Sequence, residues 1–458
     1  MEDMKNGKRS SFSGKLGYVL AAAGASVGLG NIWRFPYLAA KYGGGIFLII
    51  YIVLALTFGY TMIVAETAIG RMTRKSPVGA FKSFGKKKWL SFGGWINAVI
   101  PVLIVPYYSV IGGWVIKYLV EYFRGNAKLL AEDGYFTDFI SNGASTELCF
   151  VAFCAFTLII IFAGVQNGIE RVSKIMMPIL IVLSVIIAVY SVTRPGALAG
   201  VKYFLVPNVK NFSWMTVVSA MGQMFYSLSI AMGILITFGS YMKKDTAIED
   251  STRNVEIFDT GIAIMAGLMI IPAVFAFSGG DPDTLQAGPS LMFITIPKVF
   301  QNMGFGTVIG IVFFVLVLFA AVTSSIALTE SAVSTFEDEL GWGRKKATVL
   351  VGVIMLALGS LSSLGYGPLA GIKIIGMQFL DLFDFLTNSV MMPIAALITS
   401  LLVSRVVGID KIEEEIIHGE SAFRRKKVFV VMIKYLCPVF AIIILLSSVA
   451  NALGWIKM

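Results

Sequence analysis

The first apolar stretch of the chain is interrupted halfway along its length. Residues 15–38 are long enough to cross a bilayer, yet they contain Gly24, Gly28 and Gly30, with Asn31 directly after the last glycine. An unsatisfied polar group in hydrocarbon is costly, so irregular backbone at that depth is tolerated only where it is buried in protein or lines a cavity. A membrane helix broken in this way indicates a binding site between its two halves.

Composition restricts the class of protein. The chain has 458 residues, of which 57% are hydrophobic and 14% charged, so it suits one polytopic membrane domain and not a soluble protein. The single His418 and the three cysteines Cys149, Cys154 and Cys437 have no metal-ligand spacing. No phosphate-binding loop and no paired nucleophile and base can be recognised, so we expect no enzymatic activity. The basic residues behind the net charge of +10 fall in short blocks between apolar segments, which indicates membrane-protein loops and no nucleic-acid partner.

Eleven segments have the roughly 20 apolar residues that a membrane-spanning helix needs. They cover residues 15–38, 44–70, 89–123, 148–164, 171–192, 214–241, 254–278, 306–336, 346–363, 375–404 and 428–453. We therefore predict an all-α polytopic membrane protein in which residues 1–458 form one domain embedded in the lipid bilayer.

Basic residues predict the orientation of these spans. With the N-terminus in the cytoplasm, the inner segments hold 25 Lys and Arg and the outer segments hold 10, while Arg34 and Lys434 lie within spans. Because cytoplasmic loops are enriched in Lys and Arg, this asymmetry predicts a cytoplasmic N-terminus in a plasma-membrane protein. An odd number of spans then predicts an extracellular C-terminus.

A second span is also interrupted. Residues 214–241 carry Gly222, Gln223 and the small or polar run from Ser227 to Gly233 at mid-depth. One glycine-rich helix could serve helix packing alone. Two broken helices whose starts are five spans apart favour an inverted repeat, as in secondary transporters. The predicted halves are residues 15–192 and 214–404, followed by an extra helix at 428–453.

Polar groups near the breaks suit a cation and a zwitterion. Asn31 and the carbonyls freed at residues 24–27 offer hard oxygen ligands, which alkali cations prefer. Asp259 is an acid inside an apolar span and could neutralise such a cation. Hydroxyls such as those of residues 323–325 usually bond back to their own helix, yet three in succession cannot all face lipid. The backbone amides of residues 29–30, at the start of the outer half-helix, suit a carboxylate. The C-terminus of a half-helix in the sixth span suits an ammonium group. A zwitterionic amino acid matches both positions.

Five motifs closely resemble the neurotransmitter:sodium symporter family. They are Gly28–Pro36, Lys41–Gly45, Glu66 followed by Gly70-Arg71, Gln223–Ser229 and Ala320–Ala327. The resemblance runs through all the spans, and the eleven-span length is similar to the bacterial branch that transports hydrophobic or aromatic amino acids. It implies eleven helices in a five-plus-five inverted repeat with the first and sixth helices discontinuous.

The resemblance also implies site residues, position by position. The first of two sodium sites would use the Ser26 carbonyl, Asn31, Ser227 and Asp259. The second would use the carbonyls of Gly24, Val27 and Ala320 with the hydroxyls of Thr323 and Ser324. Substrate would contact Ser26, Leu29, Gly30, Tyr108, Tyr226, Ser229, Met232, Ser325 and Leu328. The gates would be Arg34 with Asp384 outside and Arg9 with Asp338 inside, the latter beside Phe12 and Tyr241.

The implied function is sodium-coupled import of a neutral, hydrophobic or aromatic amino acid by alternating access. Chloride-dependent relatives carry a neutral residue at the position of Asp259, beside residues matching Tyr51, Gln223 and Ser227, so we expect transport without chloride. Two alternatives stay open. A proton-coupled transporter of the same fold would need a titrating group that Thr323 and its neighbour do not offer, and an amino-acid sensor would bind without transporting. The oligomeric state, including a monomer, also stays open.

Overall fold

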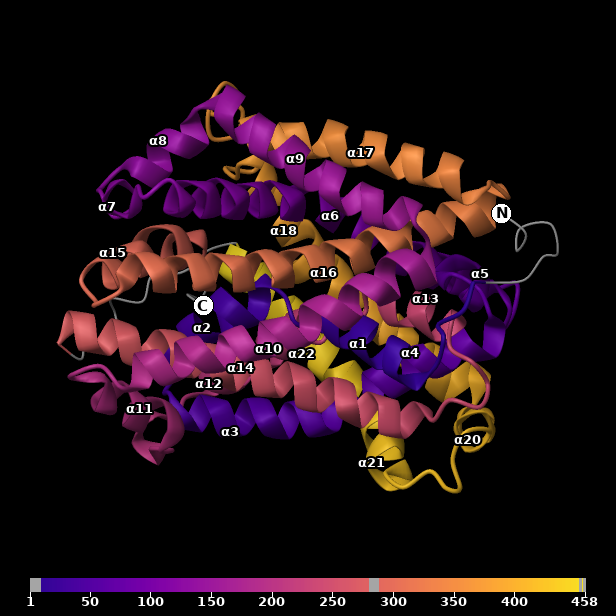
Figure 1. Ribbon diagram of the computed structural model, residues 1–458. Coiled ribbons are helices and arrows are strands. Elements are labelled where there is room, and N and C mark those ends of the chain that lie inside the picture. The colour runs from indigo at the N-terminus through magenta and orange to yellow at the C-terminus, as the bar shows by residue number, and fades with distance from the viewer. Residues whose placement is uncertain (1–9, 280–287, 453–454, 456–458) are drawn as a thin grey trace.

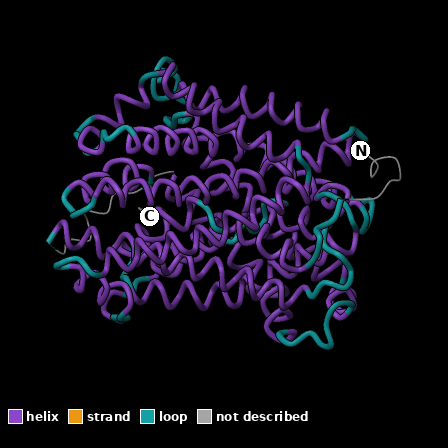
Figure 2. The backbone as a smooth tube through the Cα atoms, in the orientation of Figure 1, coloured by secondary structure: helices purple, strands orange, loops and turns teal. Residues whose placement is uncertain are grey.

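A computed structural model describes residues 10–279, 288–452 and 455. Long helices run side by side along one direction of the molecule (Figure 1), and helix dominates the whole trace (Figure 2). Within these ranges the only β-type pairings are the isolated bridges Gly44–Pro207 and Ile374–Met377. The all-α prediction is therefore confirmed.

Nine helical stretches within the described ranges are long and apolar enough to cross a membrane without interruption. They are Gly45–Thr73 (α3, Gly45–Leu54, η3, Ala55–Gly59, and α4, Tyr60–Thr73), Lys88–Phe123 (α6), Gly143–Phe162 (α9), Val165–Val192 (η4, Val165–Glu170, and α10, Arg171–Val192), Ile248–Ser278 (α14), Gly306–Leu340 (α16), Arg344–Leu364 (α17), Phe379–Val407 (α18, Phe379–Asp384, η8, Phe385–Met391, α19, Met392–Leu402, and η9, Val403–Val407) and Lys426–Asn451 (α21, Lys426–Val431, η10, Met432–Leu436, and α22, Cys437–Ala452).

The first span is broken as the sequence predicts. Helix α1 (Lys15–Ser26) ends at the interruption, and η2 (Gly30–Arg34) with α2 (Phe35–Lys41) continues at a bend of 53°. In the middle of the bundle, α1 packs against α10, α14 and α16. The break therefore opens between helices and not toward lipid.

The sixth span is broken as well. Helix α12 (Trp214–Ser227) and α13 (Ile234–Ser240) are separated by Leu228–Gly233, where Ser229, Ala231 and Gly233 have φ of 52°, 59° and 70°. Left-handed backbone of this kind ends an α-helix. Both predicted discontinuities are confirmed. Neither α12 nor α13 is long enough to cross a bilayer alone, so the count of eleven spans stays a prediction.

Several predicted span boundaries are wrong by about four to six residues: the helices begin at Gly143 and not at residue 148, and at Val165 and not at residue 171, and two further starts have clear local causes. Helix α14 begins at Ile248 and not at residue 254, because Glu249 and Asp250 are favourable near the positive end of a helix and both backbone N–H groups donate to Glu420. The tenth span begins at Phe379 and not at residue 375, because Ile375 has φ of 53° in a turn that an isolated bridge closes.

Short helices cover the two ends of the bundle. They are α5 (Pro77–Lys82), α7 (Ala127–Leu130), α8 (Tyr135–Ser141), α11 (Ala197–Leu205), α15 (Ile296–Gln301) and α20 (Ile409–Ile417), with the turns η5 (Val209–Asn211) and η7 (Leu291–Thr295). In Figure 1, α5, α20 and α21 gather at one end, and α7, α8, α11 and α15 gather at the other. The α5 end carries the basic blocks that the sequence places in inner loops.

Candidate functional site

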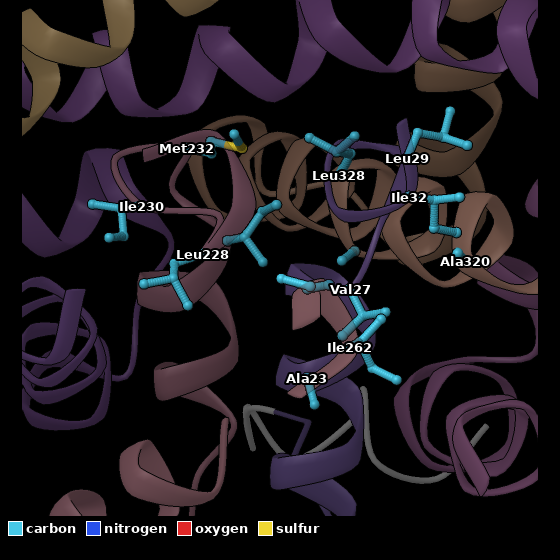
Figure 3. Packing of buried hydrophobic residues seen from close by; sticks show 14 of the residues in the cluster. Ala23, Val27, Leu29, Ile32, Leu228, Ile230, Met232, Ile262, Ala320 and Leu328 are labelled. Atoms are coloured by element: carbon cyan, nitrogen blue, oxygen red, sulfur yellow. The ribbon is translucent and has the colours of Figure 1, made fainter. Parts of the chain in front are cut away.

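A small cavity lies where the two broken spans meet. About 30 Å³ of it is open to the centre of a water molecule. Its lining residues are Ala25, Ser26, Gly28, Leu29, Gly30, Asn31, Ile104, Tyr108, Tyr226, Ser229, Met232, Ile234, Ser324 and Leu328. Figure 3 shows Leu29 and Leu328 close together and Met232 on the unwound stretch of the sixth span.

The cavity gathers all but one of the predicted substrate residues. Ser325 lies elsewhere, because its hydroxyl is 3.2 Å from that of Thr157 on α9. Ser324 and Leu328 are four residues apart and face the cavity on one side of α16, so Ser325, the next residue after Ser324, is turned away from it. Four lining residues were missed: Ala25, Gly28, Ile104 and Ile234. Of these, Ile104 was recognisable, since it precedes Tyr108 by one helical turn.

Asp259 is fully buried and is held by three neutral donors. Its carboxylate accepts hydrogen bonds from Asn31 Nδ2 at 2.8 Å, from the Ser227 hydroxyl at 2.9 Å and from the Tyr51 hydroxyl at 3.0 Å. Side chains from the first, second, sixth and seventh spans therefore meet at one acid. The predicted first-sodium residues Asn31, Ser227 and Asp259 are brought into direct contact.

A second group of oxygens surrounds the hydroxyl of Ser324. Ser324 Oγ lies 3.3 Å from Gly24 O, 3.2 Å from Ala25 O and 3.4 Å from Val27 O. One hydroxyl carries one proton and cannot donate fully to three carbonyls. This surplus of hard oxygens fits an alkali cation by ligand chemistry.

The remaining predicted oxygen ligands are locally satisfied. The hydroxyl of Thr323 donates back along α16 to Phe319 O at 3.0 Å and to Ala320 O at 3.2 Å. The hydroxyl of Ser26 donates to Ala22 O at 3.1 Å, so only its carbonyl is a candidate ligand.

Three side chains hold the two breaks in register. Glu66, fully buried on α4, accepts the Ala231 N–H at 2.8 Å. Ser229 Oγ donates to Ala25 O at 2.9 Å, and Gln223 Nε2 donates to Gly30 O at 3.0 Å. Within the described ranges, the second oxygen of the Glu66 carboxyl has no hydrogen-bond partner. The motif containing Glu66 was recognised in the sequence, but this structural role was not.

An aromatic ring closes one end of the cavity. A Cβ atom built on Gly30 would come within 2.4 Å of the Tyr226 ring, and the Arg34 guanidinium carbon lies 5.2 Å from the centroid of that ring. Asp384 accepts hydrogen bonds from Asn388 at 2.6 Å and from Tyr107 at 3.2 Å. The ion pairs found in the described ranges do not join Arg34 to Asp384, so the predicted outer pair is not in direct contact here.

The predicted inner gate is described only in part. Arg9 lies outside the described residues, and Asp338 accepts the Ser76 N–H at 2.6 Å. Phe12 is buried, packs edge-on against the ring of Tyr241, and donates its N–H to Tyr241 O at 3.0 Å. The predicted neighbours of this gate are therefore together.

A membrane helix bundle in which two interrupted spans enclose an oxygen-rich cavity has the architecture of a secondary transporter. The sodium:neurotransmitter symporter family matches residues 9–130 and 135–454, and the chain belongs to that family. It is 34% identical over 450 residues to the uncharacterized sodium-dependent transporter YhdH of Bacillus subtilis, covering 97% of this chain and 99% of that protein. It is 26% identical over 474 residues to the human sodium- and chloride-dependent GABA transporter 2, covering 89% and 75%.

A solved structure is similar along the whole fold. The crystal structure of MhsT in complex with L-phenylalanine matches with a TM-score of 0.86 and 34% identity, covering 96% of this chain and 100% of that one. The protein described here is therefore a sodium-dependent multi-pass membrane transporter and not an enzyme.

Proposed function

We propose that this transporter imports a neutral, hydrophobic or aromatic amino acid together with sodium, and does so without chloride. The observation that carries the proposal is one cavity bounded by the broken backbone of the first span, by Asn31, which donates to the buried Asp259 carboxylate, and by apolar side chains. The L-phenylalanine complex of the similar MhsT structure supports the same substrate class.

The polar end of the cavity suits a carboxylate. The Leu29 N–H lies 3.4 Å from the Tyr108 hydroxyl, a long contact that leaves both groups able to donate to an incoming anionic oxygen. The start of the outer half-helix adds a favourable dipole. We assign the substrate carboxylate to this position, next to Ser26 and Gly30.

The apolar part of the lining suits a hydrophobic substrate side chain. Ile104, Met232, Ile234 and Leu328 contribute to it. The open space is enough for about one or two water molecules, so an amino acid enters only if lining side chains move. Met232 has a flexible side chain that can adapt to the substrate.

Two sodium sites follow from the two oxygen groups. The first would use the Ser26 carbonyl with Asn31, Ser227 and Asp259. The second would use the carbonyls of Gly24, Val27 and Ala320 with the hydroxyls of Thr323 and Ser324. Bound sodium would supply positive charge beside the substrate carboxylate. Because the carboxylate would contact the first sodium ion, each of the two would raise the affinity for the other by the same factor.

Asp259 supports independence from chloride. Its carboxylate already occupies the hydrogen-bonding positions offered by the Tyr51 and Ser227 hydroxyls. An anion at the same place would be repelled by the fixed negative charge.

Alternating access would use the two ends of the cavity in turn. Tyr226, Arg34 and Asp384 would close the outer side, and Arg9 with Asp338 would close the inner side. The repeats at residues 15–192 and 214–404 would move against each other, with the N-terminus cytoplasmic and the C-terminus extracellular in the plasma membrane.

Uptake in proteoliposomes tests the proposal. A panel of amino acids is offered while sodium, chloride and pH are varied separately, and uptake of a hydrophobic or aromatic amino acid should require sodium alone. Uptake that persists without sodium and follows a pH gradient would favour proton coupling. Binding without uptake would favour a sensor.

A further inference from the structure

A lysine faces outward inside the last membrane span. Lys434 lies within the apolar span Lys426–Asn451, and its side chain is exposed. Val431, Tyr435 and Val439 are exposed on the same side. Lys434 therefore belongs to the surface that meets lipid.

A charged group in that position needs a partner. Charged side chains in membrane spans usually face the protein interior, because hydrocarbon does not solvate them. Within the described ranges, the ion pairs and hydrogen bonds of the molecule include none to Lys434. Where this span begins, Arg425 and Lys426 pair with the carboxylates of Glu256 and Glu413. The residues that the structure describes therefore supply no carboxylate partner for Lys434.

Helix geometry directs the lysine toward one layer of headgroups. Lys434 lies eight residues beyond Lys426, which is about 12 Å along a helix axis. Side chains lean toward the N-terminus of their helix, and long lysine stems extend to reach polar surroundings. The Lys434 ammonium is therefore carried toward the basic end of the span.

A second lysine lies closer to the basic end of the same span. Lys427 precedes Lys434 by seven residues, and its side chain is also exposed. No ion pair joins Lys427 to a carboxylate in the part of the chain that the structure describes. Two ammonium groups thus approach the same headgroup layer, next to the exposed apolar side chains of Val431, Tyr435 and Val439.

We propose that this face binds an anionic phospholipid. The phosphate would lie between Lys427 and Lys434, and an acyl chain would run along Val431, Tyr435 and Val439. A second copy of this chain fits less well, because residues 426–451 contain no Asp or Glu and a symmetric pair would present lysine to a face without acids. The inference does not depend on which substrate is transported.

Native mass spectrometry of the full chain tests the site. The purified protein is offered phosphatidylglycerol or phosphatidylcholine, and we expect the wild type to retain the anionic lipid preferentially. Lys434→Met should weaken the affinity for the anionic lipid about fivefold, the loss expected for one lysine near an anionic surface. Lys434→Arg should retain binding, and Lys427→Met should also reduce it.

The matched control is Lys87→Met, which removes a lysine from a basic loop outside the last span and should leave retention unchanged. Thermal unfolding checks that each variant is folded. Equal retention by the wild type and Lys434→Met, or an equal loss in Lys87→Met, would overturn the site. A dimer that disappears in Lys434→Met would also overturn it, by assigning the face to a second copy.

Discussion

The ring of Tyr226 lies directly against the α-carbon of Gly30. A Cβ atom on Gly30 would come within 2.4 Å of Tyr226 Cδ1 and 2.5 Å of Cε1. The two residues belong to the first and sixth spans, so this contact joins the two broken helices at the point where the cavity closes. The Arg34 guanidinium beside the same ring adds a cation–π contact. Movement of Tyr226 would thus admit or retain a solute.

Replacing Gly30 with alanine should displace Tyr226 and weaken substrate binding. Overpacking a close contact costs about 1–3 kcal/mol, and a cost near the lower part of that range corresponds to about a tenfold loss of affinity. Equilibrium binding of a labelled amino acid to the purified protein measures the change.

Gly222→Ala is the matched control for Gly30→Ala. Gly222 lies in α12, in the same sixth span as Tyr226, and a Cβ atom there would meet nothing within 4 Å. Alanine is favoured over glycine in a helix by up to about 1 kcal/mol, so this variant should bind normally and melt no lower than the wild type. Unchanged affinity in Gly30→Ala would show that the Tyr226 contact does not limit substrate entry.

Replacing Asp259 with serine should create a requirement for an external anion. The variant removes the fixed negative charge but leaves the Tyr51 and Ser227 hydroxyls in place as donors. Wild-type uptake should be equal in sodium chloride and sodium gluconate, whereas Asp259→Ser should be slow in gluconate and stimulated by chloride.

A control for charge removal is Asp133→Asn, which changes an exposed loop acid that pairs with Lys298. Its uptake should match the wild type in both salts. Loss of wild-type uptake in gluconate would contradict the role given to Asp259.

The breaks and the buried acid could be predicted because their causes are local. Glycines, amides and a carboxylate inside apolar segments are unfavourable in hydrocarbon wherever the neighbouring helices lie. Asn31 and Asp259 were therefore recognisable before their hydrogen bond was known, and so was the interruption after Ser227.

Features that depend on helix rotation or on distant partners could not be predicted in the same way. The hydroxyl run on α16 did not reveal that Ser324 faces the cavity while Ser325 faces Thr157. The role of Glu66 depends on the left-handed backbone at Ala231, which lies 165 residues away along the chain. Start points such as Ile248 depend on capping by a carboxylate from another loop.

Glu66 should stabilise the unwound part of the sixth span. Glu66→Gln keeps an oxygen acceptor for the Ala231 N–H and should unfold near the wild-type temperature. Glu66→Leu leaves that buried N–H without its partner, which costs about 1–3 kcal/mol, so its unfolding temperature should fall. Thermal unfolding in detergent compares the two variants.

Ala231→Gly provides a check on the backbone. Ala231 has φ of 59°, and a residue with a Cβ atom pays about 1–2 kcal/mol in this conformation, whereas glycine does not. This variant should therefore be at least as stable as the wild type. A lower melting temperature for Gln than for Leu at position 66 would refute the proposed hydrogen-bonding role.

A buried ion pair should hold the ends of four helices together at the α5 end of the bundle. Arg344 on α17 donates to both oxygens of Glu330 on α16, at 3.0 and 2.5 Å, and its Nε donates to Ile161 O on α9 at 2.9 Å. The Tyr241 hydroxyl, directly after α13, donates to the same carboxylate at 2.7 Å. Glu330 is fully buried and the Arg344 side chain is 15% exposed.

Replacing one partner of this pair should destabilise the protein much more than replacing both. Arg344→Met leaves the Glu330 carboxylate buried without a cation, which costs about 3–5 kcal/mol, whereas Arg344→Met combined with Glu330→Gln should cost less than the sum of the single changes. The exposed pair of Lys82 and Glu339, 2.6 Å apart, is the matched control, since Lys82→Met should change stability by at most about 1 kcal/mol. A double-variant cycle on thermal unfolding measures the coupling, and additive effects of the two changes would mean that Arg344 and Glu330 do not act as a pair.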